Sequence, residues 1–199
     1  MRFSSVALLL AWLSASSVWA QPRPSQDAGV VRSAIEKVYY DVEGDTPGAL
    51  AVELRRHGPQ ARGRGYFGLT EWKVDAAYRW NERPGMCTLD GLTVRVVMQT
   101  HLPRWRRPPH APRSLSGAWR RFLAALDLHE HGHRALAEEA AEAIRRRLVS
   151  LRASTCGPIE ARARQEILTL LDEYERRHHA YDAATGHGRT QGAVWPPRP

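Results

Sequence analysis

Lysine is nearly absent from this chain, although the chain is strongly basic. Its only lysines are Lys37 and Lys73, so arginine supplies almost all of the positive charge behind the net charge of +8. The arginines are scattered and do not form a basic arm, and no nucleic-acid-binding motif accompanies them. We therefore do not expect a nucleic-acid-binding protein. The positive charge indicates at most a peripheral contact with the anionic surfaces of a cell envelope.

Long hydrophobic runs are missing after the first 20 residues. No later stretch approaches the ~18 consecutive apolar residues that a membrane-spanning helix needs, so we expect no transmembrane segment. Residues 1–20 contain Arg2, then an apolar run over 6–13, and end in the small residue Ala20. This is the pattern of a cleavable secretory signal peptide. It predicts cleavage after Ala20 and a periplasmic or secreted protein.

Cysteine is also scarce, since Cys87 and Cys156 are the only two in the chain. The short Cys-x-x-Cys spacing found in many zinc sites is therefore lacking. An even number of cysteines in an exported protein favours a disulfide. We predict a Cys87–Cys156 bridge, and closing a loop of about 70 residues would stabilise the fold by ~4 kcal/mol in the chain-entropy model.

The first half of the exported chain has the patterns of a small sheet. Residues 21–36 hold few large apolar side chains and are predicted to be a flexible lead-in to a single domain over 37–199. Apolar residues recur at every second position in 72–80 and 92–102, as in half-buried strands, and 37–42 is a further strand. We also predict a short helix that starts at Thr46-Pro47 and stops at Gly58, and turns at Pro84-Gly85 and Asp90-Gly91.

The second half is dominated by two helices. Apolar residues spaced by three or four positions predict one helix over 116–151, capped by Ser114 or Ser116, and another that starts at Gly157-Pro158. Because the connection between them is short, the two helices should pack antiparallel. We therefore expect an α+β fold in which a small antiparallel β-sheet packs on a long helical hairpin.

The first long helix carries the motif His129-Glu130-x-x-His133. The two histidines lie on the face that otherwise holds core residues, so their imidazoles can converge on one metal ion. Glu130 lies about 100° further around the helix, beside such an ion, where a general base is needed. The pattern indicates a Zn²⁺ site, and the plainer alternative is a pair of core histidines. Gly132 between them indicates a close backbone approach or a slight kink of the helix at the site.

A catalytic zinc site needs a third protein ligand. In the predicted hairpin, residues 129–133 face residues 176–180, so the end of the second helix and the tail should reach the site. This leaves a set of candidate ligands or supporting residues: Glu175, His178, Asp182 and His187. A carboxylate such as Asp182 is equally suited to hold a ligand histidine. Tyr181 is placed either to hold an oxyanion or in the core.

The motif and the tail together resemble a known family. His129-Glu130-x-Gly132-His133 and the tail segment 181–192, which reads Tyr-Asp-x-x-Thr-x-His-Gly-x-Thr-Gln-Gly, are similar to a bacterial family of unknown function that carries the label of predicted secreted zinc-dependent proteases. The resemblance extends from Tyr39 to Pro196. It implies a zincin-like metallopeptidase domain over 37–199. The family tail also places its histidine at the position of His187, which implies His187 as the third zinc ligand.

Two functions follow as expectations. The first is an exported zinc-dependent metallopeptidase that hydrolyses peptide bonds of a peptide or protein substrate, with a metal-activated water and Glu130 as general base. The alternative is a metal-binding or cell-envelope-associated protein without turnover, whose zinc site is closed by a fourth ligand such as His178 or Asp182. The sequence does not indicate an oligomeric state.

Overall fold

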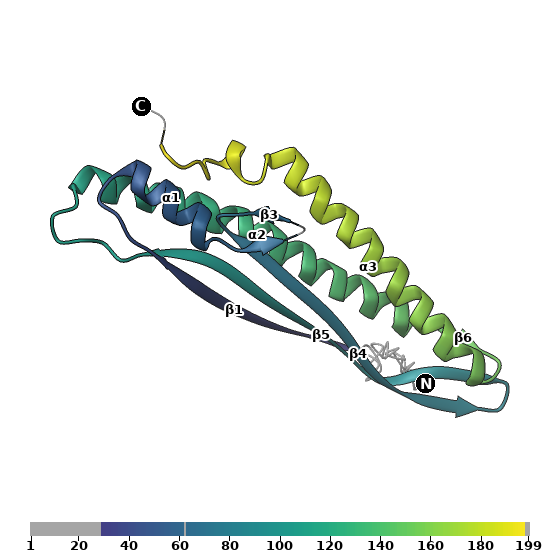
Figure 1. Cartoon of the computed structure of the whole chain (residues 1–199). Helices are drawn as coiled ribbons and strands as arrows, with labels where there is room; N and C mark the ends of the chain where they lie inside the picture. Colours follow the sequence, from purple (N-terminus) through teal and green to yellow (C-terminus); the bar gives the residue numbers. More distant parts are fainter. Residues whose placement is uncertain (1–28, 62, 198–199) are drawn as a thin grey trace, which may run out of the picture.

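The sheet is built around one long central strand. In the computed structural model, which describes residues 29–61 and 63–197, β5 (Met86–Trp105) lies between β1 (Val30–Val42) and β4 (Leu69–Arg83). The short strand β6 (Arg152–Ala153) pairs with the start of β5. Two long helices cover one face of this sheet (Figure 1). The prediction of an α+β fold with a sheet packed on a helical hairpin is confirmed.

The prediction that all strands run antiparallel is wrong for the first strand. β4 pairs antiparallel with β5, but β1 pairs with β5 in parallel, from Val30 opposite Thr93 to Val42 opposite Trp105. The sheet is therefore mixed. Alternation of apolar residues shows which side chains face the core, but it is the same for a strand that runs in either direction.

The predicted lead-in is also wrong in part, because β1 begins at Val30 and not at residue 37. β1 is an edge strand, and most of its side chains between residues 32 and 37 are exposed, so this segment lacks the alternation of a half-buried strand. The predicted signal peptide (1–20) and the first part of the lead-in (21–28) lie outside the described residues.

The helix after β1 has the predicted ends. α1 (Pro47–His57) begins with the side chain of Thr46 accepting a hydrogen bond from the Ala49 N–H at 3.2 Å, and it ends before Gly58. A small hairpin of β2 (Gln60–Ala61) and β3 (Arg64–Gly65) then leads into β4.

Of the two predicted turns, one is correct. Pro84 and Gly85 join β4 to β5, but Asp90-Gly91 lies inside β5. Gly91 has a φ of 61°, and the pairing with β4 shifts by one residue at this point, which is a β-bulge. A glycine with positive φ serves a bulge as well as a turn, and the sequence alone did not distinguish them.

The helical hairpin consists of α2 (Arg113–Val149) and α3 (Gly157–Thr185). α2 begins at Arg113 after Pro112 and has no side-chain cap, so the predicted serine cap is wrong. Two apolar clusters pack around α2. One lies toward α1 and includes Leu126, and the other lies toward the turn to α3 and includes Ala137. The motif at 129–133 lies between these clusters.

Cys87 and Cys156 form the predicted disulfide, which ties the start of β5 to the start of α3. A disulfide indicates an oxidising compartment. Within residues 29–61 and 63–197, no helix combines the length and the apolar character needed to cross a bilayer.

The tail returns along α2 toward α1 (Figure 1). After η1 (Arg189–Gln191), Trp195 is buried against Trp119 and Phe122 of α2, and its indole N–H donates to the carbonyl of Pro47 at 3.0 Å. This anchor holds the residues between α3 and Trp195 across the motif on α2.

Candidate metal centre

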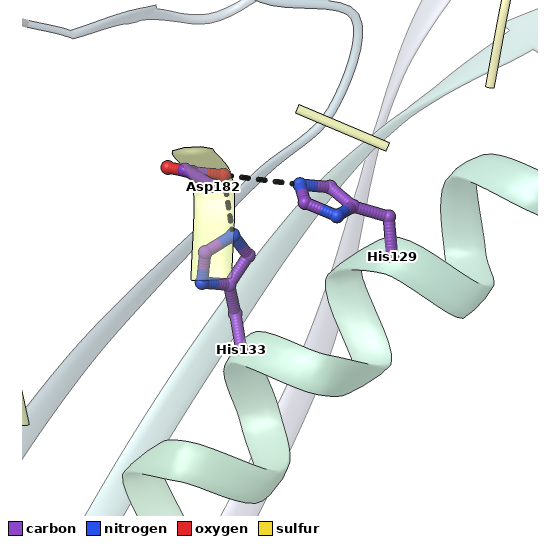
Figure 2. Close-up of side chains that lie close together, drawn as sticks. All are labelled: His129, His133 and Asp182. Carbon is purple, nitrogen blue, oxygen red and sulfur yellow. Dashed lines mark hydrogen bonds and ion pairs between the residues drawn. The ribbon is translucent and has the colours of Figure 1, made fainter. Parts of the chain in front are cut away.

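Two histidines of α2 and one aspartate of α3 converge between the two apolar clusters (Figure 2). His129 and His133 are 3% and 8% exposed. Their Nε2 atoms lie 3.2 and 3.1 Å from the same oxygen, Oδ1 of Asp182. One ligand atom from each residue lies within 4.8 Å of the other two. The predicted pair of inward histidines is therefore present, and Asp182 joins it.

These spacings fit a metal ion. Zinc–nitrogen bonds are ~2.0–2.1 Å long, so neighbouring ligand atoms of a tetrahedral site lie about 3.3 Å apart. The two distances from Asp182 to the histidines, 3.2 and 3.1 Å, are close to this value. The set of two imidazole nitrogens and one carboxylate oxygen is also one that catalytic zinc sites use.

The hydrogen bond at Nδ1 of His129, on the side away from Asp182, also fits a metal site. Its Nδ1 lies 3.1 Å from Oε1 of Gln191, and because an amide oxygen only accepts, Nδ1 carries the proton. The contact of 3.2 Å between Nε2 of His129 and the Asp182 carboxylate needs a proton or a cation between the two atoms. A proton on Nε2 makes it a hydrogen bond, and a metal ion could take the place of that proton.

His133 has a second histidine behind it. Its Nδ1 lies 2.9 Å from Nδ1 of His178, whose ring is stacked between His133 and Trp72 of β4. Burial, together with the nearby His133, lowers the pKa of His178 to about 4, so this ring is neutral. A neutral His178 can accept a hydrogen bond from the Nδ1–H of His133 and so leave the lone pair of Nε2 of His133 free for a metal. Such outer partners orient ligand histidines.

The charges of the site favour a bound cation. Burial would raise the pKa of Asp182, but hydrogen bonds from His129 and His133 outweigh it, so the pKa lies well below the usual range and the carboxylate is ionised. Burial would lower the pKa of His129, but the Asp182 hydrogen bond and the Glu130 charge raise it overall. The same negative charges that hold a proton on His129 attract a metal ion.

His187 lies beside this group and not within it. Its Nδ1 is 3.2 Å from Oδ1 of Asp182, and its side chain is 49% exposed. It has a φ of 53°, which is uncommon for a residue other than glycine, between Gly186 and Gly188, which also have positive φ. The bend predicted for this segment is present. The role of His187 as a zinc ligand stays a prediction, and among the described residues the convergent group contains Asp182 in its place.

The other candidates lie at different distances from the group. Glu175 is 3.5 Å from His179 on the same helix and is not part of the convergent set. His178 supports His133, as described above. Tyr181 stacks on His129 with ring centroids 5.1 Å apart, and its hydroxyl donates to the carbonyl of His129 at 3.2 Å. Tyr181 is therefore a packing partner of His129.

Glu130 is almost fully buried, at 2% exposure, and is not in the convergent group of His129, His133 and Asp182. Oε2 accepts a hydrogen bond of 2.8 Å from the hydroxyl of Thr70, at the start of β4. Burial raises the pKa of Glu130, and the Thr70 hydrogen bond opposes that rise. A buried carboxylate with a raised pKa, next to a metal-binding group but not in it, is suited to accept and return a proton.

Gly132 allows Tyr181 to reach His129. A Cβ at position 132 would lie 2.2 Å from the hydroxyl oxygen of Tyr181 and 2.3 Å from Cζ. No ring can remain at those distances. Of the two alternatives predicted for Gly132, a close approach is present, and the group that approaches the helix backbone is the Tyr181 ring.

We expect Gly132→Ala to destabilise the protein, although alanine is normally the better helix residue. The usual gain is about 1 kcal/mol in a helix interior. Here the Tyr181 ring must swing away and give up its contacts with His129, and overpacking of this kind costs about 1–3 kcal/mol. Thermal unfolding measures the change, and zinc content reports whether His129 is displaced.

Gly117→Ala is the matched control, because Gly117 lies in the same helix and a Cβ there would meet only Arg121, at an ordinary 3.6 Å. That variant should gain stability by up to about 1 kcal/mol. Equal stabilisation by both substitutions would show that Tyr181 does not occupy the space beside Gly132.

Sequence reasoning missed three supporting residues: Thr70, Trp72 and Gln191. Both Thr70 and Trp72 lie on β4, far from the motif in the chain. Trp72 belonged to the predicted alternation over 72–80, whereas Thr70 lies before it and no pattern indicated it. Gln191 was part of the tail pattern Thr-Gln-Gly, so a signal for it was present, but no role was assigned.

Comparison with known proteins identifies a family. The family model described as "Bacterial protein of unknown function (DUF922)" matches residues 37–188. The match includes His129, Glu130, His133, Asp182 and His187. No curated protein matches the chain, and no solved structure matches it.

Proposed function

The chain belongs to this bacterial family of unknown function, and from the site within the matched residues we propose that it is an exported zinc-dependent metallopeptidase. The observation that carries the proposal is the separation of roles around His129, His133 and Asp182. These three residues form the ligand group, whereas Glu130 is buried beside them and bonded to Thr70. A carboxylate beside the metal position, but not among the ligands, stands where a general base for a metal-bound water is needed.

Zinc held by His129, His133 and Asp182 would lower the pKa of a water molecule toward about 7 and polarise a peptide carbonyl. Glu130 then takes the proton from the attacking water and returns it to the leaving amine. Gln191 and His178 keep the two imidazoles oriented with Nε2 toward the metal position. Export fits both the N-terminal signal pattern and the Cys87–Cys156 disulfide.

A second function is favoured by His187. Its Nδ1 lies 3.2 Å from Oδ1 of Asp182, close enough that a small change of the tail would make it a fourth ligand. Four protein ligands close a zinc site and leave no place for water. The protein would then be a metal-binding or envelope-associated protein without turnover.

The proposed activity is tested with a broad peptide library whose products are identified by mass spectrometry. We expect the zinc-loaded protein to cleave peptides, to lose cleavage on treatment with a chelator, and to regain it when zinc is restored. His133→Ala, which loses a ligand, is the inactive control. Cleavage that continues in the zinc-free protein would contradict a metal-dependent mechanism.

Cobalt substitution separates the two functions without a substrate. In an open site, a small anion such as azide enters the cobalt coordination sphere and changes the visible spectrum. In a site closed by His187, azide leaves the spectrum unchanged. His187→Ala should then restore the response.

A further inference from the structure

A continuous chain of hydrogen bonds connects Glu130 to a buried arginine. The Thr70 hydroxyl donates to Oε2 of Glu130 at 2.8 Å and lies 3.1 Å from the hydroxyl of Thr100. Nη1 of Arg134 donates to the same Thr100 hydroxyl at 3.2 Å. Thr100 is fully buried and Arg134 is 7% exposed. The chain crosses from α2 to the two adjacent strands β5 and β4 and returns to α2.

The two ends of this chain determine the direction of every bond in it. A guanidinium only donates, and an ionised carboxylate only accepts. Thr100 must therefore accept from Arg134 and donate to Thr70, and Thr70 must donate to Glu130. The Thr70 hydroxyl also lies 3.5 Å from the backbone carbonyl oxygen of Glu130. Both hydroxyls are thus oriented toward the carboxylate.

Arg134 is itself held in place. Its Nη2 donates to Oδ1 of Asp127 at 3.2 Å, and Oδ2 of Asp127 accepts from Lys37 of β1 at 2.9 Å. The guanidinium is therefore balanced by a carboxylate on one side and directed at Thr100 on the other.

We propose that Thr70, Thr100 and Arg134 are positioning residues that hold the Glu130 carboxylate in a single orientation. Oε2 is committed to the Thr70 hydroxyl, so Oε1 is the oxygen that forms the new O–H bond when an O–H bond of water breaks. The catalytic part of this inference rests on the proposed function. The structural part, an energetic coupling between Thr70 and Glu130, does not.

The coupling is tested by thermal unfolding of the purified zinc-loaded protein in a double-mutant cycle of Thr70→Val and Glu130→Ala. Each single variant should lower the melting temperature. In the Glu130→Ala background, Thr70→Val has no hydrogen bond to a carboxylate left to remove. The double variant should therefore lower the melting temperature by less than the sum of the two single decreases. Thr93→Val, on the other face of β5, is the control and should be additive with Glu130→Ala.

The positioning role is tested by kinetics on a cleaved peptide. Thr70→Val and Thr100→Val should lower kcat about 10–100-fold, as outer partners of an active site do, with KM and zinc content unchanged. Thr70→Ser, which keeps the hydroxyl, should restore most of kcat. Thr93→Val should leave kcat unchanged.

The outcomes are distinct. If the decreases in melting temperature for Thr70→Val and Glu130→Ala are additive, the proposal is overturned, whether or not the protein cleaves peptides. An inactive Thr70→Ser variant would overturn it as well, because the methyl group and not the hydroxyl would then matter. Absence of cleavage by the wild type in every assay would count against the metallopeptidase proposal, while the melting cycle would still decide the coupling.

Discussion

Glu130→Gln should lower peptide hydrolysis by about 10²–10⁴-fold, the loss expected when a general base is removed. The substitution keeps the size of the side chain and keeps an oxygen that can accept from Thr70 at the position of Oε2. It removes the ability to take a proton. Because Glu130 is outside the ligand group, bound zinc and thermal stability should stay close to those of the wild type. Steady-state kinetics and elemental analysis of the same sample measure both.

The result is informative in each direction. Hydrolysis by Glu130→Gln at the wild-type rate would end the mechanism proposed for Glu130. Loss of zinc from this variant would show that Glu130 is a ligand and not a base. Glu142→Gln is a suitable control for the loss of a glutamate carboxylate on α2, because Glu142 pairs with Arg145 of the same helix and lies outside the convergent group.

Asp182→Ala should weaken zinc binding by roughly 10³-fold. Binding of zinc by three or four protein ligands is worth ~10–16 kcal/mol in total, so one ligand accounts for several kcal/mol. Asp182 also supplies the negative charge nearest to both Nε2 atoms, at 3.2 and 3.1 Å. Competition with a coloured zinc chelator at fixed pH measures the change, with His133→Ala as the reference for loss of a ligand.

His187→Ala is the comparison that assigns the third ligand. Because His187 is half-exposed and contacts Asp182 from outside the convergent group, its loss should weaken zinc binding less than tenfold, which is below the ~10–100-fold range of supporting residues. A loss as large as that of Asp182→Ala would make His187 a true ligand. The site would then be closed, and the function without turnover would be favoured.

The features that the sequence predicted correctly all depend on regular repeats or on neighbours in the chain. A helix repeats every 3.6 residues, so His129 and His133 must share a face and Glu130 must lie to one side of it. Because the connection between α2 and α3 is short, the two helices pack antiparallel. The predicted register placed residues 129–133 within one helical turn of His178 and Asp182, the α3 residues that His133 contacts. The disulfide and the ends of α1 followed from equally local signals.

Other features were decided by contacts between distant segments. β1 runs parallel to β5, and both possible directions of β1 have the same alternation of side chains, so the sequence pattern did not distinguish them. The choice between Asp182 and His187 depends on the bend of the tail, where three successive residues adopt positive φ and Trp195 is anchored on Pro47.

The sequence by itself therefore determined the two histidines, the separate position of Glu130, the α+β class and the disulfide, because helix geometry and cysteine count require no knowledge of the tertiary arrangement. Only the tertiary structure decided that Asp182 joins His129 and His133, that the Tyr181 ring fills the space beside Gly132, and that the Thr70 hydroxyl donates to Glu130. These contacts join α2 to α3 and to β4. Their distances depend on how whole elements pack, and packing is set by the sum of many side-chain volumes and not by any spacing along the chain.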